Sequence, residues 1–370
     1  MIHDITLGDL RFARAPISAH STRGVPYERW IRVGMPYIPQ DLINGTFYLY
    51  RTMEDAEAGK NPAGSGFVIR YDGPPGRPGG KGTQHYAVTN WHVACDAGAS
   101  IIRLNTVDGG TDIIEFGPEE WCFDPGKHDI AITPITIDEK IHSVSAVSTK
   151  MLYNPRPDWG KDHNVGVGDD VFMIGLFVDH GGFTTNIPSA RFGNISMLPD
   201  KRAKIKQPTG FRGESFIVDM HSRSGFSGSP VYVYRTMGSD LNSSFFGQEV
   251  KVSRIKLSSG DRASGHVHFK PTLFSLLGIH WGQFPERWEL KERQKFSEAG
   301  NNLVTDGSYV EGMSGMTCVI PALAIWGVLE LPELKGPREM ADRARAAELA
   351  AKPETEPGIT FSASKPSPGA

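Results

Sequence analysis

The sequence predicts an all-β protein, built as a barrel or a sandwich. Between residues 44 and 325, short apolar segments alternate with clusters of glycine, proline and polar residues. β-Branched and aromatic residues dominate these segments, which is typical of strands, and no long helical pattern separates them. A chain of 370 residues with 39% hydrophobic content can form two domains or one large all-β unit of two packed barrels.

The strand segments follow one another along the chain, and turn residues bound each of them. The segment GSGFVIRY at 64–71 opens the series and LFSLLGIHW at 273–281 closes it. The clearest strands between them are predicted at 85–94, 100–105, 111–116, 129–135, 170–178, 215–220 and 230–234.

The rest of the chain is predicted to be irregular or helical. Residues 1–43 form an irregular lead segment, 71–84 is a loop rich in proline and glycine, and an insertion spans about 236–271. An apolar stripe predicts a helix from Pro321, and the alanine-rich segment 337–352 predicts an exposed helix before a disordered tail.

Composition excludes several classes of function. A net charge of −3 gives no basic field, so we expect neither a nucleic-acid nor a membrane partner. The sequence has no CxxC or HExxH motif, so we expect no metal and no cofactor. The three cysteines are widely spaced, and the N-terminus lacks the apolar run of a secretory signal. These features predict reduced thiols in a cytoplasmic protein of bacterial type.

One of the twelve histidines stands where an apolar strand meets a segment of small residues. His92 ends the run YAVTNWH, which predicts an imidazole at the edge of the core. Taken alone, His92 also fits a core histidine bound to the backbone. His128 is an alternative base, but it lacks this position between a strand and a loop.

Asp129 stands at the head of the apolar strand DIAITPI. A carboxylate there is costly to bury unless it is hydrogen-bonded, and an imidazole N–H would satisfy it. Taken alone, Asp129 also fits a carboxylate that caps a turn. Asp96 and Asp124 lie nearer to turns and are weaker candidates.

The segment SGFSGSP surrounds Ser227 with glycines. Gly225 and Gly228 permit backbone angles that other residues resist, so the turn can direct the N–H groups of Gly225 and Ser227 at one point. A serine nucleophile needs such amides, a base and a group that orients the base. Ser224 and Ser229 lack glycines at the required spacing, and a simple hairpin turn is the structural alternative.

The order of these three candidates along the chain distinguishes between the known types of serine hydrolase. It runs His–Asp–Ser, whereas the subtilisin type runs Asp–His–Ser and the α/β-hydrolase type runs Ser–Asp–His. Together with the all-β pattern, this order resembles the trypsin-like (chymotrypsin-fold) serine peptidases. The segments that carry the resemblance are GSGFVI (64–69), TNWHVA (89–94), HDIAI (128–132), GFSGSP (225–230) and GIHWG (278–282).

The resemblance implies two packed six-stranded antiparallel β-barrels with a C-terminal helix. The first barrel would span 44–150 and the second 151–332, which includes the insertion and the helix. Residues 1–43 would precede the barrels, and 333–370 would form the exposed helix and the tail.

The resemblance also implies a role for each matching residue. Ser227 would attack the scissile carbonyl, and His92 would take its proton and return it to the leaving amine. Asp129 would fix the tautomer of the imidazole. The N–H groups of Gly225 and Ser227 would form the oxyanion hole, and a protein or peptide would be the substrate.

The pocket segments resemble the V8-type glutamyl endopeptidases in particular. There a histidine on the pocket wall contacts an acidic P1 side chain, and His280 has that position here. His221 and Ser222 precede the nucleophile where related enzymes line the same pocket, and Trp281 and Gly282 would line the substrate channel. The resemblance thus implies a preference for Glu or Gln at P1.

Two alternatives to an endopeptidase remain. The chain could be a catalytically silent trypsin-like module that binds peptides or serves as a scaffold, although the intact triad argues against it. An esterase or acyltransferase could use the same machinery. Restraint of a cytoplasmic peptidase would come from narrow specificity, from the insertion, or from a regulatory partner that binds the termini.

Overall fold

The computed structural model describes residues 38–73, 84–155, 165–221, 225–235, 274–289 and 309–351. All of them belong to one compact unit, Ile38–Ala370. The lead segment as far as residue 37, the insertion at 236–271, Ser222 and the tail after residue 351 lie outside the described residues. No helix within the described ranges is long and apolar enough to cross a membrane.

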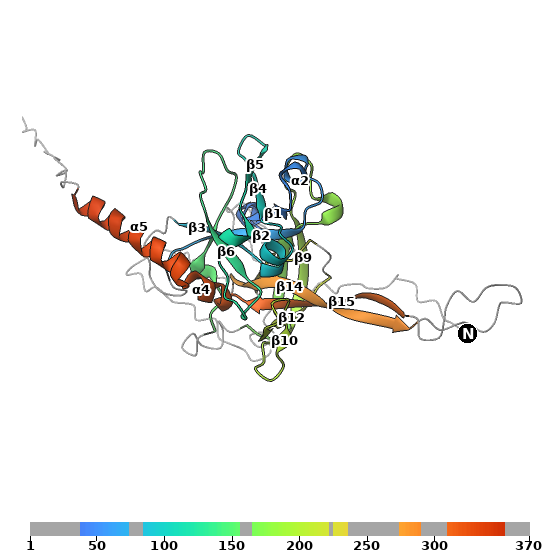
Figure 1. Ribbon diagram of the computed structural model, residues 1–370. Helices are drawn as coiled ribbons and strands as arrows, with labels where there is room; N and C mark the ends of the chain where they lie inside the picture. The colour runs from blue at the N-terminus through green and yellow to red at the C-terminus, as the bar shows by residue number, and fades with distance from the viewer. Residues whose placement is uncertain are drawn as a thin grey trace, which may run out of the picture. The chain divides into compact units, whose positions relative to one another are not determined.

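The first sheet has seven strands, in the order β5-β4-β1-β2-β3-β6, with β7 beside β2. Figure 1 labels the strands β1 to β6 of this sheet. Neighbours along this path are antiparallel, and β7 is parallel to β2. The strands are β1 (Thr46–Tyr50), β2 (Gly64–Arg70), β3 (His85–Thr89), β4 (Ile101–Asn105), β5 (Thr111–Ile114), β6 (Ala131–Ile135) and β7 (Val147–Ser148).

The second sheet closes into a six-stranded barrel in the order β12-β15-β14-β13-β8-β9. A short hairpin, β10 (Ile205–Lys206) with β11 (Arg212–Gly213), lies between β9 and β12 in the chain. The barrel strands are β8 (Asp170–Gly175), β9 (Ser189–Met197), β12 (Phe216–Asp219), β13 (Pro230–Tyr234), β14 (Phe274–Glu289) and β15 (Tyr309–Pro321).

Apolar core residues fill the concave side of each curled sheet, and a further cluster lies between the two sheets. In β2, Val68 packs with the interior of the first sheet, whereas Phe67 and Ile69 join a cluster that contains Phe172 and Ile279 of the second barrel. Burial on both faces explains why β2 reads as an almost continuous apolar run. The two sheets therefore pack directly against each other through β2.

The prediction of an all-β fold of two packed β-barrel sheets is confirmed: the second sheet is a closed barrel, and the first is a half-barrel that stays open. Its path ends at β5 and β6, which do not pair as strands. Pro134 in β6 has no N–H to donate, and proline within sheets is confined to edge strands. In the described part of the chain, an isolated bridge from Cys122 to Ile132 continues beyond this edge, after a turn at Pro118–Glu120.

Within the described residues, the helices are short except for the last. The C-terminal helix predicted from Pro321 corresponds to α4, and α5 begins five residues before the predicted start at 337. Near the start of α5, the guanidinium of Arg338 lies 3.9 Å from the centroid of the Tyr71 ring and attaches α5 to the first sheet. The α-helices are α1 (Gln40–Asn44), α2 (Met53–Ala58), α4 (Leu323–Leu329) and α5 (Pro332–Ala351); single turns are His92–Asp96, Pro118–Glu120, Thr149–Met151 and Val178–His180.

Candidate active site

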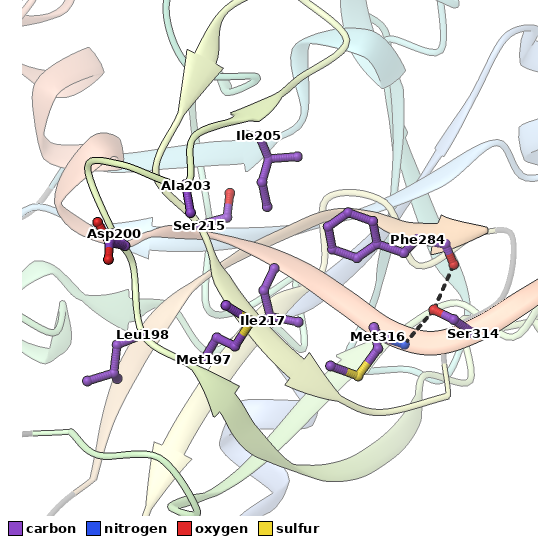
Figure 2. Close-up of a pocket in the computed structure, with 10 residues that line it drawn as sticks. All are labelled: Met197, Leu198, Asp200, Ala203, Ile205, Ser215, Ile217, Phe284, Ser314 and Met316. Carbon is purple, nitrogen blue, oxygen red and sulfur yellow. Dashed lines mark hydrogen bonds between the residues drawn. The ribbon is translucent and has the colours of Figure 1, made fainter. Parts of the chain in front are cut away.

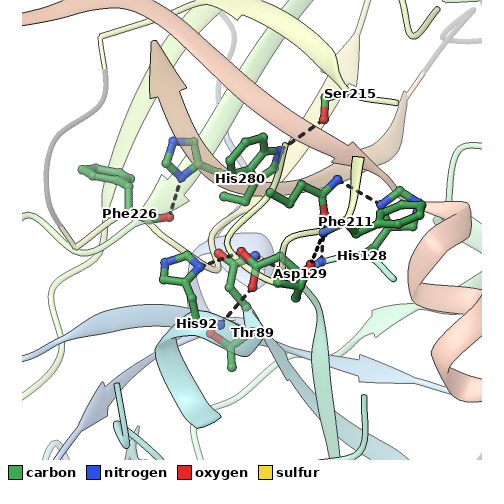
Figure 3. Close-up of polar contacts among 12 residues, drawn as sticks. Thr89, His92, His128, Asp129, Phe211, Ser215, Phe226 and His280 are labelled. Atoms are coloured by element: carbon green, nitrogen blue, oxygen red, sulfur yellow. Dashed lines mark hydrogen bonds and ion pairs between the residues drawn. The ribbon is translucent and has the colours of Figure 1, made fainter. Parts of the chain in front are cut away.

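His92 and Asp129 meet where β3 ends and β6 begins. Antiparallel pairing places Thr89 opposite Ala131, so the two flanking loops lie side by side. His92 Nδ1 is 2.6 Å from Asp129 Oδ2, and the His92 backbone N–H donates to Asp129 Oδ1 at 2.9 Å (Figure 3). Because an ionised carboxylate can only accept, Nδ1 carries the proton and Nε2 presents its lone pair.

The carboxylate of this pair is fully buried, while the His92 side chain is 23% exposed. Neighbours also hold the Asp129 backbone on both sides: Asn90 Nδ2 donates to its carbonyl at 2.8 Å, and its N–H donates to Gln207 Oε1 at 2.8 Å. Such a carboxylate is oriented in advance, which is the arrangement that a general base requires.

His128 does not compete with His92 for the role of base. Its Nδ1 accepts a hydrogen bond from Gln207 Nε2 at 3.1 Å, and its ring packs edge-on against Phe211. Burial lowers the pKa of His128. The imidazole of His128 is therefore occupied by contacts with the β10–β11 hairpin.

The loop around Ser227 lies against the first sheet. Its two glycines have left-handed backbone angles, φ 95° at Gly225 and φ 86° at Gly228. A Cβ at Gly228 would collide with the Ser65 carbonyl oxygen, so only glycine fits there. The Ser65 N–H donates to the Ser227 carbonyl at 2.9 Å, and Thr89 Oγ1 donates to the Ser65 carbonyl at 2.7 Å.

These contacts bring the loop of Ser227 to the strand that precedes His92. Within the described residues, however, no hydrogen bond joins His92 to Ser227 Oγ. Catalytic hydrogen bonds of this kind are often long in substrate-free enzymes and tighten when substrate binds. Cys95, three residues after His92, is unsuited to the role of nucleophile, because burial raises the pKa of its thiol to about 12.

The predicted pocket residues are in different environments. His280 is buried, and its Nδ1 lies 3.1 Å from the Phe226 carbonyl oxygen. Trp281 is half-buried and donates from Nε1 to Ser215 Oγ at 3.2 Å, whereas a Cβ at Gly282 would meet open space. His221 is exposed beside Gly315.

Comparisons with known proteins add a general likeness. No family model matches the chain, and no curated protein matches it significantly. The solved structure of Deg5 is similar over 52% of this chain and 75% of that one, with 20% identity and a TM-score of 0.33. The active form of the Rv3671c protease from M. tuberculosis is similar over 83% of this chain and 93% of that one, with 14% identity and a TM-score of 0.36. At these identities and scores the likeness assigns no role to any residue of the site.

Sequence reasoning missed two residues that hold the site together. Gln207 is only 2% exposed and binds Asp129 and His128 at once. Ser65 is fully buried, and its Oγ donates to the Gly225 carbonyl at 2.7 Å while it accepts from the Leu176 N–H at 2.8 Å. The motif GSGFVI contains Ser65, but its pattern signals only a strand.

A pocket of about 340 Å³ on the second sheet was also not predicted (Figure 2). It lies beside Ser215, the residue that binds the Trp281 side chain, and Phe284 of β14 forms part of its wall. Most of the side chains that line it are apolar. They are Met197, Leu198, Asp200, Ala203, Ile205, Ser215, Ile217, Phe284, Ser314 and Met316.

Proposed function

We propose that this protein is a serine endopeptidase of the trypsin-like type. The observation that carries the proposal is the buried Asp129 carboxylate, joined to His92 at 2.6 Å beside the glycine-bounded loop of Ser227. Ser227 Oγ attacks the peptide carbonyl while His92 Nε2 takes its proton. His92 then protonates the leaving amine, and water hydrolyses the acyl-enzyme by the reverse use of the same groups.

In this proposal the N–H groups of Gly225 and Ser227 stabilise the oxyanion. The left-handed angle at Gly225 and the bond from Ser65 to its carbonyl support the proposal, because both restrict the backbone of the loop. A fluorophosphonate probe reacts only with an activated serine. We therefore expect covalent labelling of the folded full-length protein, with the adduct on Ser227 by peptide mapping.

A catalytically silent peptide-binding module is the second candidate. The observation that favours it is the lack of a hydrogen bond between His92 and Ser227 among the described residues. An unlabelled but folded protein would support this candidate. Comparison of matched amide and ester substrates would separate an endopeptidase from an esterase that uses the same machinery.

For P1 we propose Gln or Glu, read by His280 as in the V8-type branch. Burial lowers the pKa of His280 from the ordinary 6.5 to about 4, so its ring is neutral at pH 7. A neutral imidazole supplies no positive charge to a P1 carboxylate, and an unpaired buried charge is costly. The amide of Gln is therefore the better partner at neutral pH.

This proposal predicts a pH-dependent selectivity between two peptides that differ only in Gln or Glu at P1. At pH 7.5 we expect kcat/KM to be about tenfold higher for Gln, which corresponds to about 1.4 kcal/mol. The ratio should fall toward pH 5, because a Glu side chain with an ordinary pKa of about 4.3 is then partly protonated. A clear preference for Glu at pH 7.5, or for Arg or Leu at any pH, would contradict it.

We further propose that the 340 Å³ pocket accepts an apolar substrate side chain on the acyl side of the cleaved bond. The antiparallel pairing of β13 with β14 ends at the pair Pro230 and Ile279. From Trp281 onward, that edge of β14 has no partner strand in the part of the chain that the structure describes. An extended peptide added there would run toward Phe284 and the pocket.

Filling this pocket should lower kcat/KM for long peptide substrates only. Ala203 is exposed at the rim, so Ala203→Phe can occupy the pocket without disturbing the core. We expect kcat/KM to fall about tenfold for peptides with a large apolar residue three or four positions before the cleaved bond. Ala203→Ser is the matched control. Equal losses on a dipeptide substrate would show that the pocket plays no part in recognition.

A further inference from the structure

The peptide unit between Phe226 and Ser227 decides where the Ser227 N–H points. A trans peptide is planar, and its C=O and N–H point in opposite directions. Within the proposed function, that N–H belongs to the oxyanion hole. Whatever fixes the Phe226 carbonyl therefore also aims the Ser227 N–H at the substrate.

Two donors fix the Phe226 carbonyl. The Ser229 N–H donates to it at 3.0 Å across the tight turn, and the His280 ring donates from Nδ1 at 3.1 Å (Figure 3). The turn bond is local to the loop, whereas His280 belongs to β14 and brings the rigidity of the second barrel. Among the residues that the structure describes, His280 supplies the one hydrogen bond that joins this peptide unit to a strand of the barrel.

The backbone of His280 also binds the same loop, through both its N–H and its carbonyl. The His280 N–H donates to the Ser229 carbonyl at 2.9 Å, and the Gly228 N–H donates to the His280 carbonyl at 3.0 Å. These two bonds fix the distance between β14 and the loop. The ring of His280 therefore meets the Phe226 carbonyl from a position that the backbone has already set.

The protonation state suits this contact. A carbonyl oxygen only accepts, so Nδ1 of His280 must carry the hydrogen. The ring is 3% exposed and stays neutral at pH values well above 4, since burial lowers its pKa to about 4. A neutral ring with one fixed N–H keeps the same hydrogen bond throughout the working range of a histidine base.

We propose that His280 is a positioning residue for the oxyanion hole. Its Nδ1–H holds the Phe226 carbonyl so that the Ser227 N–H points at the developing oxyanion. The inference rests on the proposed function but is separate from reading P1, because it acts on every substrate. Loss of the Nδ1–H donor should lower kcat more than it changes KM, since the oxyanion forms only in the transition state.

The test uses p-nitrophenyl acetate, an ester that has no P1 side chain. His280→Leu removes the donor at similar size, whereas His280→Asn keeps an N–H near the position of Nδ1. We expect the acylation rate of the Leu variant to fall about 100-fold with KM changed less than threefold. The Asn variant should recover to within about fivefold of the wild type. Ser227→Ala gives the background rate.

Each outcome separates this inference from the proposed function. If the wild type shows no acylation above the Ser227→Ala background, the proposed function fails. If it does acylate and the Leu variant acylates equally fast, His280 does not position the oxyanion hole. Equal losses in the Leu and Asn variants would also overturn the inference. If the Leu variant does not fold by near-UV circular dichroism, His280→Gln takes its place, because its amide cannot reach the position of Nδ1.

Discussion

Replacing Ser227 by alanine is expected to abolish labelling by a fluorophosphonate and to lower kcat by at least about 10⁴-fold. The proposed reaction forms its covalent bond at Ser227 Oγ, so no acyl-enzyme can form without it. The residual rate would come from the oxyanion hole and substrate binding alone. In-gel fluorescence of the labelled protein and the turnover of a peptide substrate measure both effects.

Ser229→Ala is the matched control, since Ser229 lies in the same loop two residues further on. Its Oγ is buried and has no hydrogen-bond partner within the described residues. Removal of a buried, unpaired hydroxyl should leave stability unchanged or slightly higher. We expect Ser229→Ala to label like the wild type. Persistent labelling of Ser227→Ala at another residue would refute Ser227 as the nucleophile.

The contact of His92 with Asp129 could be predicted from local sequence patterns. Each residue stands where an apolar strand meets a loop, and the contact spans only 37 residues of chain. Once β3 and β6 pair, the two loops are adjacent without further information. The left-handed turn at Gly225 and Gly228 could also be predicted from the sequence, because glycine is the residue that such angles require.

The contacts between the sheets could not be predicted in this way. Ser65 Oγ reaches Gly225 across 160 residues, and Gln207 reaches Asp129 across 78. Hydrophobic patterning predicts which residues are buried, but it does not predict which polar group a buried serine or glutamine will bind. The same reason explains why the second contact of His280, through Nδ1 to Phe226, was not foreseen.

The open first sheet is a different case, because its signal was present in the sequence. Pro134 lies inside the predicted strand 129–135 and marks it as an edge strand. Closure of a barrel requires an unbroken ladder between its first and last strands. An edge strand at β6 is therefore consistent with a first sheet that stays open as a half-barrel.

Asp129→Asn should lower kcat by about 10⁴-fold while the protein remains folded. The asparagine oxygen can still accept from the His92 N–H, so the backbone contact survives. Its amide N–H₂, however, would face Nδ1 of His92 and favour the tautomer with the proton on Nε2. That nitrogen could then no longer accept the proton of Ser227. Peptide turnover and the rate of fluorophosphonate labelling should fall together, with an unchanged near-UV spectrum.

Asp124→Asn is the control for loss of a carboxylate near the same strand. Asp124 pairs with Lys127 at 2.7 Å at a partly exposed turn, and such surface pairs contribute about 0–1 kcal/mol. Its removal should leave kcat within about twofold of the wild type. A kcat for Asp129→Asn within about tenfold of the wild type would mean that the buried carboxylate does not set the tautomer of His92. The 2.6 Å contact would then be a structural bond, and the proposed role of Asp129 in catalysis would be refuted.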